Sequence, residues 1–178
     1  MMTDIMLPKY LAEIGYKNPD DAYFDTNTLV EGADLDAAPL CIDIGGHHGI
    51  GLSRVVDKHP TLPNGSLVLQ DLPKCLSEVK GLSEKITMMP YDFFTPQPVK
   101  ANAMKKGYSK LLLNDIVMPR TGASLTQTVM DMQVMALGSA YERTEPMWTS
   151  LLQSAGLKIV KIWPDGCGYE SVVEAELA

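Results

Sequence analysis

The sequence predicts an α/β protein in which one sheet lies between two layers of helices. Three observations support this fold class. Apolar strand-like runs alternate with helical patterns, the run APLCIDI at 38–44 leads into a glycine-rich loop, and KIVKIW and SVVEAEL form a hairpin pattern around PDGCGY. Strands that alternate with helices build a three-layer α/β sandwich.

Each predicted element follows from its local pattern. Continuous apolar runs are typical of strands buried on both faces, and helical spacing of apolar residues is typical of amphipathic helices. The predicted strands are 38–44, 66–73, 85–94, 108–117, 158–163 and 171–177. The predicted helices are 8–14, 50–58, 75–82, 124–138 and 142–157, the last with Thr144 as an N-cap candidate. The polar stretch 25–38 is predicted to be a loop, and the apolar residues of 124–138 and 147–157 are interpreted as core.

Composition narrows the possible partners and setting. The net charge of −7 argues against nucleic acid and anionic membranes, which attract positive proteins. No apolar run approaches the ~20 residues of a membrane span. The three cysteines, Cys41, Cys75 and Cys167, have neither CxxC nor zinc spacing. They predict reduced thiols, a cytoplasmic protein and no metal site.

Histidine restricts the possible proton-transfer chemistry. All three histidines, His47, His48 and His59, precede residue 60. An imidazole base must therefore come from the first third of the chain. The remaining residues offer only carboxylates, lysines, tyrosines and cysteines for proton transfer.

Side chains suited to a nucleotide-like cofactor follow three successive strands. Gly45, Gly46 and Gly49 join the first strand to a helix, where glycine lets the backbone approach a ligand. Asp71 ends the next strand, where a doubly wound sheet places a ribose-binding carboxylate. Asp92 and Phe93 close the third strand and are suited to bracket a purine. Each feature alone is often structural, but the three in order favour a cofactor site. NAD fits less well, because the loop reads GGHHG and a hairpin ends the chain.

Several motifs resemble one family. IDIGGHHG, LVLQDLP, YDFFTPQPVK, KKGYSKLLLNDIV, ERTEPMWTSLLQSAGLKIVKIW and ESVVEAEL resemble successive motifs of the fungal, cation-independent O-methyltransferases that use S-adenosylmethionine (SAM) and that include the plant caffeate-type enzymes. The resemblance implies a Rossmann-like class I methyltransferase fold, shortened by a central strand and helix, with SAM as cofactor. MLPKYLAEIGYKNPDD resembles the segment before the cofactor domain, so 1–37 is interpreted as a remnant and 38–178 as the SAM-binding domain.

The resemblance also assigns roles to individual residues. Asp43, Gly45 and Gly49 match the first SAM motif, with Gly46 in the same loop. Asp71 and Leu72 match the ribose-binding pair, and Asp92 and Phe93 the pair at the adenine edge. Glu142 matches a glutamate that supports the catalytic base, and it is the best surviving catalytic candidate.

The chain departs from the family at three places. His47 replaces the usual third glycine of the loop, and helices that cap the substrate pocket are shortened between 24 and 38. PQPVK runs directly into ANAMKKGYSK, whereas relatives carry a strand, a His-Asp-Trp-type motif and a helix there. The general base is therefore missing, and two central strand edges are expected to be unpaired unless the strand 108–117 pairs with the first strand.

Three hypotheses follow. The first is an O-methyltransferase-family protein of fungal secondary metabolism that methylates a hydroxyl of an aromatic or polyketide-type metabolite, as a homodimer or together with a full-length relative. The second is a SAM-binding scaffold that works as a non-methylating cyclase or pericyclase. The third is an inactive pseudoenzyme that pairs with a full-length methyltransferase, or a decayed gene product that cannot fold.

Overall fold

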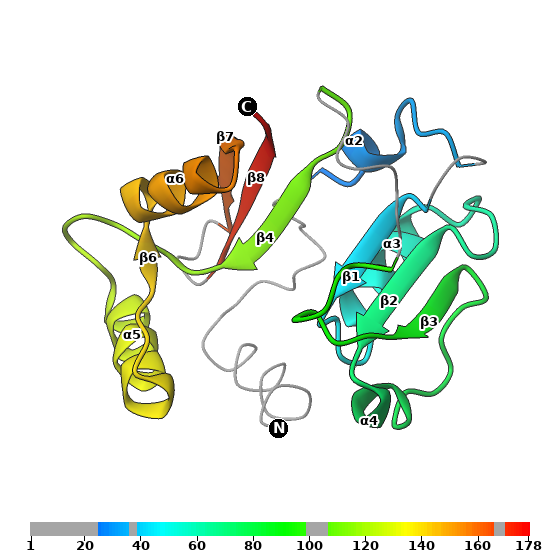
Figure 1. Cartoon of the computed structure of the whole chain (residues 1–178), viewed down its shortest axis with the longest axis horizontal. Coiled ribbons are helices and arrows are strands. Elements are labelled where there is room, and N and C mark those ends of the chain that lie inside the picture. Colours follow the sequence, from blue (N-terminus) through cyan, green and yellow to red (C-terminus); the bar gives the residue numbers. More distant parts are fainter. Residues whose placement is uncertain (1–24, 36–38, 99–106, 166–169) are drawn as a thin grey trace. The chain divides into compact units, whose positions relative to one another are not determined.

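The computed structural model describes residues 25–35, 39–98, 107–165 and 170–178 (Figure 1). These residues form two compact units, one within 25–98 and the other within 107–178. The helix predicted at 8–14 lies outside the described residues.

The first unit is built on a parallel sheet. Its strands β1 (Cys41–Ile44), β2 (Leu67–Asp71) and β3 (Ile86–Pro90) lie in the order β1-β2-β3 (Figure 1). The helices of this unit are α2 (Asn27–Val30), α3 (Ile50–Lys58) and α4 (Pro73–Leu76). Asp43 pairs with Leu69 and Asp71 pairs with Pro90. All three strands therefore end at the same edge of the sheet.

The apolar run in the sequence of β2 is explained by the position of this strand at the centre of the sheet, where its residues are buried. Leu67 and Leu69 are fully buried and pack with Leu52 of α3 and with Leu76 of α4. Side chains alternate between the two faces of a strand, so Gln70 points away from this core. Gln70 is also fully buried, and its side-chain amide exchanges two hydrogen bonds with that of Gln97, at 2.8 and 2.9 Å. This pair fastens the proline-rich segment after β3 to the centre of the sheet.

The second unit is built on an antiparallel sheet. Its strands β4 (Leu111–Asp115), β7 (Leu157–Pro164) and β8 (Ser171–Leu177) lie in the order β4-β8-β7, which confirms the predicted terminal hairpin. The short strands β5 (Val117–Met118) and β6 (Arg143–Thr144) pair in parallel. Trp148 and Leu152 of α6 (Glu145–Ser154) pack against Val173 and Ala175 of β8. The other helix of this unit is α5 (Leu125–Gly138).

Two predictions about local structure are wrong. The stretch predicted to be a loop contains α2, and Val30 at the end of this helix packs against the core of the first unit. The apolar residues of α5 are not core, because this helix buries none of its residues. Leu125, Val129 and Met132 recur at helical spacing, yet all three are exposed. Periodicity indicates which face of a helix is apolar, but it does not show whether another element covers that face.

In the described residues, β1 and β4, the strands before and after the predicted missing segment, are each an end strand of their own sheet. Within the described residues, β1 pairs only with β2, and β4 pairs only with β8. Among the described residues, the segment predicted as a strand at 108–117 forms β4 and the start of β5, which belong to other sheets than the first strand. The fold is a shortened Rossmann-like α/β fold.

We expect Leu152→Ala to lower the free energy of unfolding of the second unit by about 2–5 kcal/mol, because the truncation leaves a cavity beneath β8. Both tryptophans, Trp148 and Trp163, lie in this unit. Urea unfolding followed by tryptophan fluorescence therefore measures this change. Leu151→Ala is the matched control. Leu151 is next to Leu152 in the chain, but its side chain is exposed, so its truncation should lower the free energy of unfolding by about 1 kcal/mol or less. Equal losses in the two variants would contradict the packing of α6.

Candidate functional site

The glycine loop between β1 and α3 is held close to the end of β2. The amides of Gly45 and Gly46 both donate hydrogen bonds to the carbonyl oxygen of Gln70, at 2.8 and 3.3 Å. A Cβ atom on Gly46 would overlap the carboxylate of Asp43 and would lie 2.6 Å from Cδ1 of Leu69. Only glycine fits this position. Gly49 caps α3 with φ at 71°, in the left-handed region that glycine adopts without strain.

The carboxylate of Asp71 lies directly beside this loop. Its Oδ2 accepts a hydrogen bond from the amide of His47 at 2.9 Å, and its Oδ1 accepts one from the amide of Leu72 at 2.7 Å. Partial burial by itself raises the pKa of Asp71, but these two bonds and one from the Cys75 thiol outweigh it, and the pKa lies below its ordinary value. The carboxylate is oriented and ionised, and it keeps lone pairs for further donors.

A second carboxylate lies behind the loop. Burial, and to a lesser extent the charge of Asp71, raises the pKa of Asp43. The two acids therefore repel each other across the glycine loop, so a cation bound beside them is favoured electrostatically.

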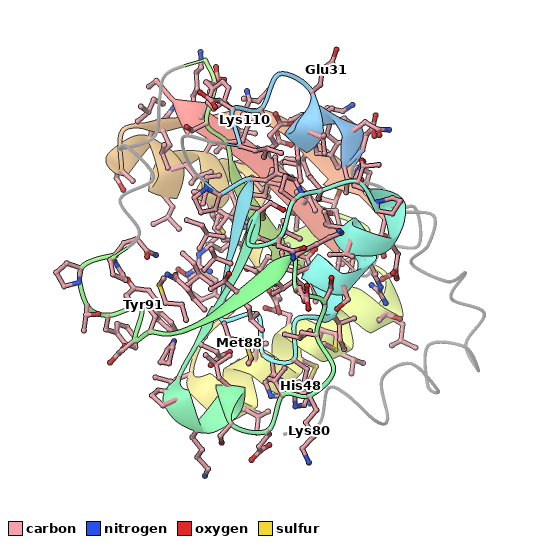
Figure 2. All side chains as sticks on the ribbon, turned by 90° about the vertical axis from the view of Figure 1, so that its right-hand side faces the viewer. Glu31, His48, Lys80, Met88, Tyr91 and Lys110 are labelled. Atoms are coloured by element: carbon pink, nitrogen blue, oxygen red, sulfur yellow. The ribbon has the colours of Figure 1, made fainter. Side chains whose placement is uncertain are left out.

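The end of β3 adds a polar turn and exposed rings. The amide of Phe94 donates to Oδ1 of Asp92 at 3.0 Å, which closes a tight turn directly after β3. Tyr91, labelled in Figure 2, donates from its hydroxyl to the carbonyl oxygen of Thr95. Phe93 and Phe94 are exposed, with ring centroids 4.4 Å apart.

The three strand ends thus combine acids with exposed apolar side chains at one edge of the sheet. Three exposed apolar residues lie there: Ile44 is the last residue of β1, Leu72 follows β2 directly, and Ile50 is the first residue of α3. A hydrogen-bond acceptor beside exposed apolar surface is suited to a ligand that carries a diol and a flat ring. Among the described residues, no group of three or more His, Cys, Asp or Glu is arranged to hold a metal ion.

The second unit contains a separate cluster of acids. The carboxyl group of Glu142 hydrogen-bonds to that of Asp115, at the end of β4, and the amide of Glu142 donates to Oδ1 of Asp131 at 2.7 Å. Burial first, and then the charge of Asp115, raises the pKa of Glu142. The pairing of β5 with β6, which matches Val117 with Arg143, brings the two acids together.

A hollow of about 610 Å³ lies on the outer side of α6. Its lining is mixed, with polar residues such as Arg120, Gln127 and Glu145 beside apolar ones such as Val117 and Met118. Glu142 and Asp115 are not part of this lining. The hollow is therefore distinct from the acid pair.

Known proteins resemble the chain over most of its length. It is 45% identical to the O-methyltransferase ATR12 of Stachybotrys chlorohalonatus, over 91% of this chain and 48% of that protein. It is 34% identical to the O-methyltransferase mfmE of Annulohypoxylon moriforme, over 86% of this chain and 44% of that protein. The chain belongs to the fungal SAM-dependent O-methyltransferase family.

Solved structures place this family member in the class I methyltransferase fold. OxaC in complex with S-adenosylhomocysteine (SAH) and oxaline matches with a TM-score of 0.75 and 26% identity, over 93% of this chain and 48% of that one. LepI in complex with SAM matches with a TM-score of 0.78 and 25% identity, over 97% and 53%. No protein-family model matches the chain.

The chain spans about half the length of the curated relatives it matches. Its alignment with ATR12 covers 188 positions, which exceeds the 178 residues of this chain. The O-methyltransferase therefore carries residues inside the aligned stretch that this family member lacks.

The structure places the predicted site residues of this family member in two groups. The first unit holds all the predicted cofactor-binding residues: Asp43, Gly45, Gly46, Gly49, Asp71, Leu72, Asp92 and Phe93. Glu142 lies in the second unit. Their roles in binding and catalysis stay predictions. Sequence reasoning missed Asp115, although an acid at the end of a predicted strand is the signal that identified Asp71.

We expect Gly46→Ala to lower the melting temperature, because the added methyl group displaces the side chain of Asp43 or Leu69. Gly51→Ala is the matched control. Its Cβ would lie 3.7 Å from Oδ2 of Asp43, an ordinary contact, and alanine is favoured over glycine in a helix such as α3. Circular dichroism melts of the two variants measure the difference. A lower melting temperature for Gly51→Ala than for Gly46→Ala would contradict the close packing at Gly46.

Proposed function

We propose that the chain binds SAM or SAH at the edge of the sheet where β1, β2 and β3 end. The observation that carries this proposal is the Asp71 carboxylate, which two backbone amides hold beside the glycine loop. In this position Asp71 would hold the ribose of the ligand by accepting hydrogen bonds from its hydroxyls. The first-turn amides of α3 face the carboxylate of the methionine portion, as helix N-termini do for anions. Leu72 and Phe93 provide apolar contacts for the adenine.

The residues present fit such a ligand. Glycine at position 46 lets the backbone pass close to the side chains of Asp43 and Leu69. The exposed side chains of Ile44, Leu72 and Phe93 offer apolar surface at the strand ends. SAM would supply an electrophilic methyl group on a positively charged sulfur. The pair of carboxylates, Asp43 and Asp71, favours that charge. Relatives that are 45% and 34% identical are O-methyltransferases, which supports the same ligand here.

We expect SAH to bind the folded chain and Asp71→Asn to weaken that binding by about tenfold or more, because a hydrogen bond to a charged acceptor is worth about 1.5–3 kcal/mol. Isothermal titration calorimetry measures the dissociation constants, and circular dichroism checks that both proteins are folded. Asp57→Asn, on the exposed face of α3, is the matched control and should bind SAH like the wild type. A cooperatively folded wild-type chain that gives no titration would remove the proposal.

The reaction that we propose is methyl transfer to a hydroxyl of an aromatic or polyketide-type metabolite. A phenol has a pKa near 10, so a base that removes its proton during attack contributes roughly 10²–10⁴ in rate. No histidine occurs between Pro60 and Ala178. Glu142 is the proposed proton acceptor, with Asp115 positioning it through their shared hydrogen bond. Because the pKa of Glu142 is raised, this carboxylate is a stronger base than an ordinary glutamate.

We expect Glu142→Gln to lower any methyl-transfer rate by about a hundredfold, within the range for general bases. The wild-type rate should rise with pH as Glu142 loses its proton, and this rise should be absent in the variant. SAH formation, measured by mass spectrometry with a panel of phenols, reports the rate. Glu145→Gln, an exposed acid in the same segment, is the control. Equal rates for the wild type and Glu142→Gln would exclude this role.

A second candidate function follows from the missing histidine. A SAM-binding scaffold without its base can hold a reactive polyketide for cyclisation or a pericyclic step, with the ligand serving as a fixed charge. A pericyclic reaction enzyme shares the fold with a TM-score of 0.74, but at 24% identity this similarity concerns the fold alone. Product turnover without formation of SAH would distinguish this function from methyl transfer.

We propose a cytoplasmic setting. Cys41 and Cys75 are free thiols, and burial raises the pKa of Cys41 to about 11, so that it stays protonated. Reduced cysteines are typical of cytosolic proteins. Among the described residues, no helix combines the length and apolar character needed to cross a bilayer.

A further inference from the structure

The helix α5 is well formed, although the core of its unit does not hold it. Its first turn is closed by a capping box: Oγ of Ser124 accepts a hydrogen bond from the amide of Gln127 at 3.2 Å, and the side chain of Gln127 accepts one from the amide of Ser124 at 3.0 Å. In the described part of the chain, the apolar core around Trp148 and Val173 includes no residue of α5. The helix lies beyond β6, away from the sheet of this unit (Figure 1). Local hydrogen bonds therefore define α5, and its surface is open to another contact.

One face of α5 is a continuous apolar stripe. Leu125, Val129 and Met132 are 81, 52 and 58% exposed, and Ala136 is exposed one turn further along. Residues three and four apart lie above one another on a helix, so these four side chains form a single line about 16 Å long, which we call the α5 stripe. Contiguous exposed apolar surface of this kind is typical of an interaction site.

The α5 stripe lies in a stretch of the chain that has almost no charge. Between Arg120 and Glu142 the sequence contains one charged residue, Asp131, and its Oδ1 accepts a hydrogen bond from the amide of Glu142 at 2.7 Å. Two copies of a chain with a net charge of −7 repel each other over most of their surface, so an uncharged face favours contact between them. A helix that binds anionic membranes carries Lys or Arg beside its apolar face, and α5 has neither.

The spacing of the α5 stripe suits an antiparallel pair of identical helices. Its intervals of 4, 3 and 4 residues read the same in both directions, so a second copy turned end to end presents the same stripe. A two-fold axis between Val129 and Met132 brings Val129 of one copy against Met132 of the other. The same axis places Leu125 of one copy against Ala136 of the other. Large side chains then face small ones, which lets the two helices pack closely, and both copies use the same patch, as a two-fold interface requires.

We propose that the α5 stripe is the interface of a homodimer, in which two copies of the chain pair antiparallel through α5. The inference goes beyond the proposed function and does not depend on it, because the proposed ligand site lies in the first unit. A helix of 14 residues is only about 21 Å long. The interface is therefore smaller than the standard area of about 800 Å² per partner, and we expect a dimer that dissociates in the micromolar range.

The test measures the oligomeric state by sedimentation velocity, over about a hundredfold range of concentration in the micromolar region. The wild type should shift from monomer to dimer across this range. Val129→Lys should raise the dissociation constant of the dimer by about tenfold or more, because it places an unpaired charge at the centre of the interface. Leu137→Lys is the matched control: it changes another exposed leucine of α5 outside the stripe, and it should dimerise like the wild type.

A mixture of two variants tests the antiparallel arrangement. Met132→Glu should weaken the homodimer as Val129→Lys does. Because positions 129 and 132 face each other across the axis, the two variants mixed in equal amounts should form a heterodimer through a lysine–glutamate pair. Both positions are exposed in the single chain, so both variants should fold. Circular dichroism and tryptophan fluorescence check this, and SAH binding should be the same as in the wild type.

Each other outcome would overturn the inference. A wild type that stays monomeric, with Val129→Lys lowering its free energy of unfolding, would mean that the stripe is covered within one chain. A monomeric wild type without such a loss would show that the stripe has no partner copy. A dimer that neither variant weakens uses another surface, and a mixture that does not associate would exclude the antiparallel arrangement. Failure of SAH to bind would affect the proposed function alone.

Discussion

The proposed site depends on one interaction, the bracketing of the Asp71 carboxylate by two backbone amides. His47 contributes one amide from the glycine loop, and Leu72 contributes the other from the turn into α4. Both amides gain an acceptor, and the carboxylate gains a fixed orientation. The bond from His47 also ties the loop that follows β1 to the end of β2, so the loop and the acid form a single structure. Without it, only the bonds from the amides of Gly45 and Gly46 to the carbonyl oxygen of Gln70 would hold the loop to β2 against the repulsion between Asp43 and Asp71.

Most of the first unit follows from its sequence. The buried run LVLQ, the glycines and the helix that ends at Lys58 are local signals, and the structure places each element near its predicted range. The exposure of the apolar side chains of α5 is beyond prediction, because apolar spacing does not show whether another element covers them. The sequence likewise indicated an acid at Glu142 but not its bond to Asp115, which depends on the pairing of two very short strands, β5 and β6.

The two groups of site residues have different physical origins. Those that follow β1, β2 and β3 owe their positions to parallel pairing within one sheet, so they converge wherever that sheet forms. The acid pair of the second unit depends on contacts outside its sheet. The proposed ligand binding therefore depends on the pairing of one sheet alone, whereas the proposed catalysis also needs the pairing of β5 with β6. A chain that lacks residues inside the segment it shares with its relatives can keep the first property without the second.

Within the described residues of the first unit, β1 is an end strand of its sheet, and this has a consequence for the edge it presents. An exposed strand edge is a template for further strands, and charged side chains are the usual protection against such growth. β1 has only four residues, and its one charge is on Asp43, whose pKa is raised. Mild acid neutralises this carboxyl before ordinary aspartates and removes the protection.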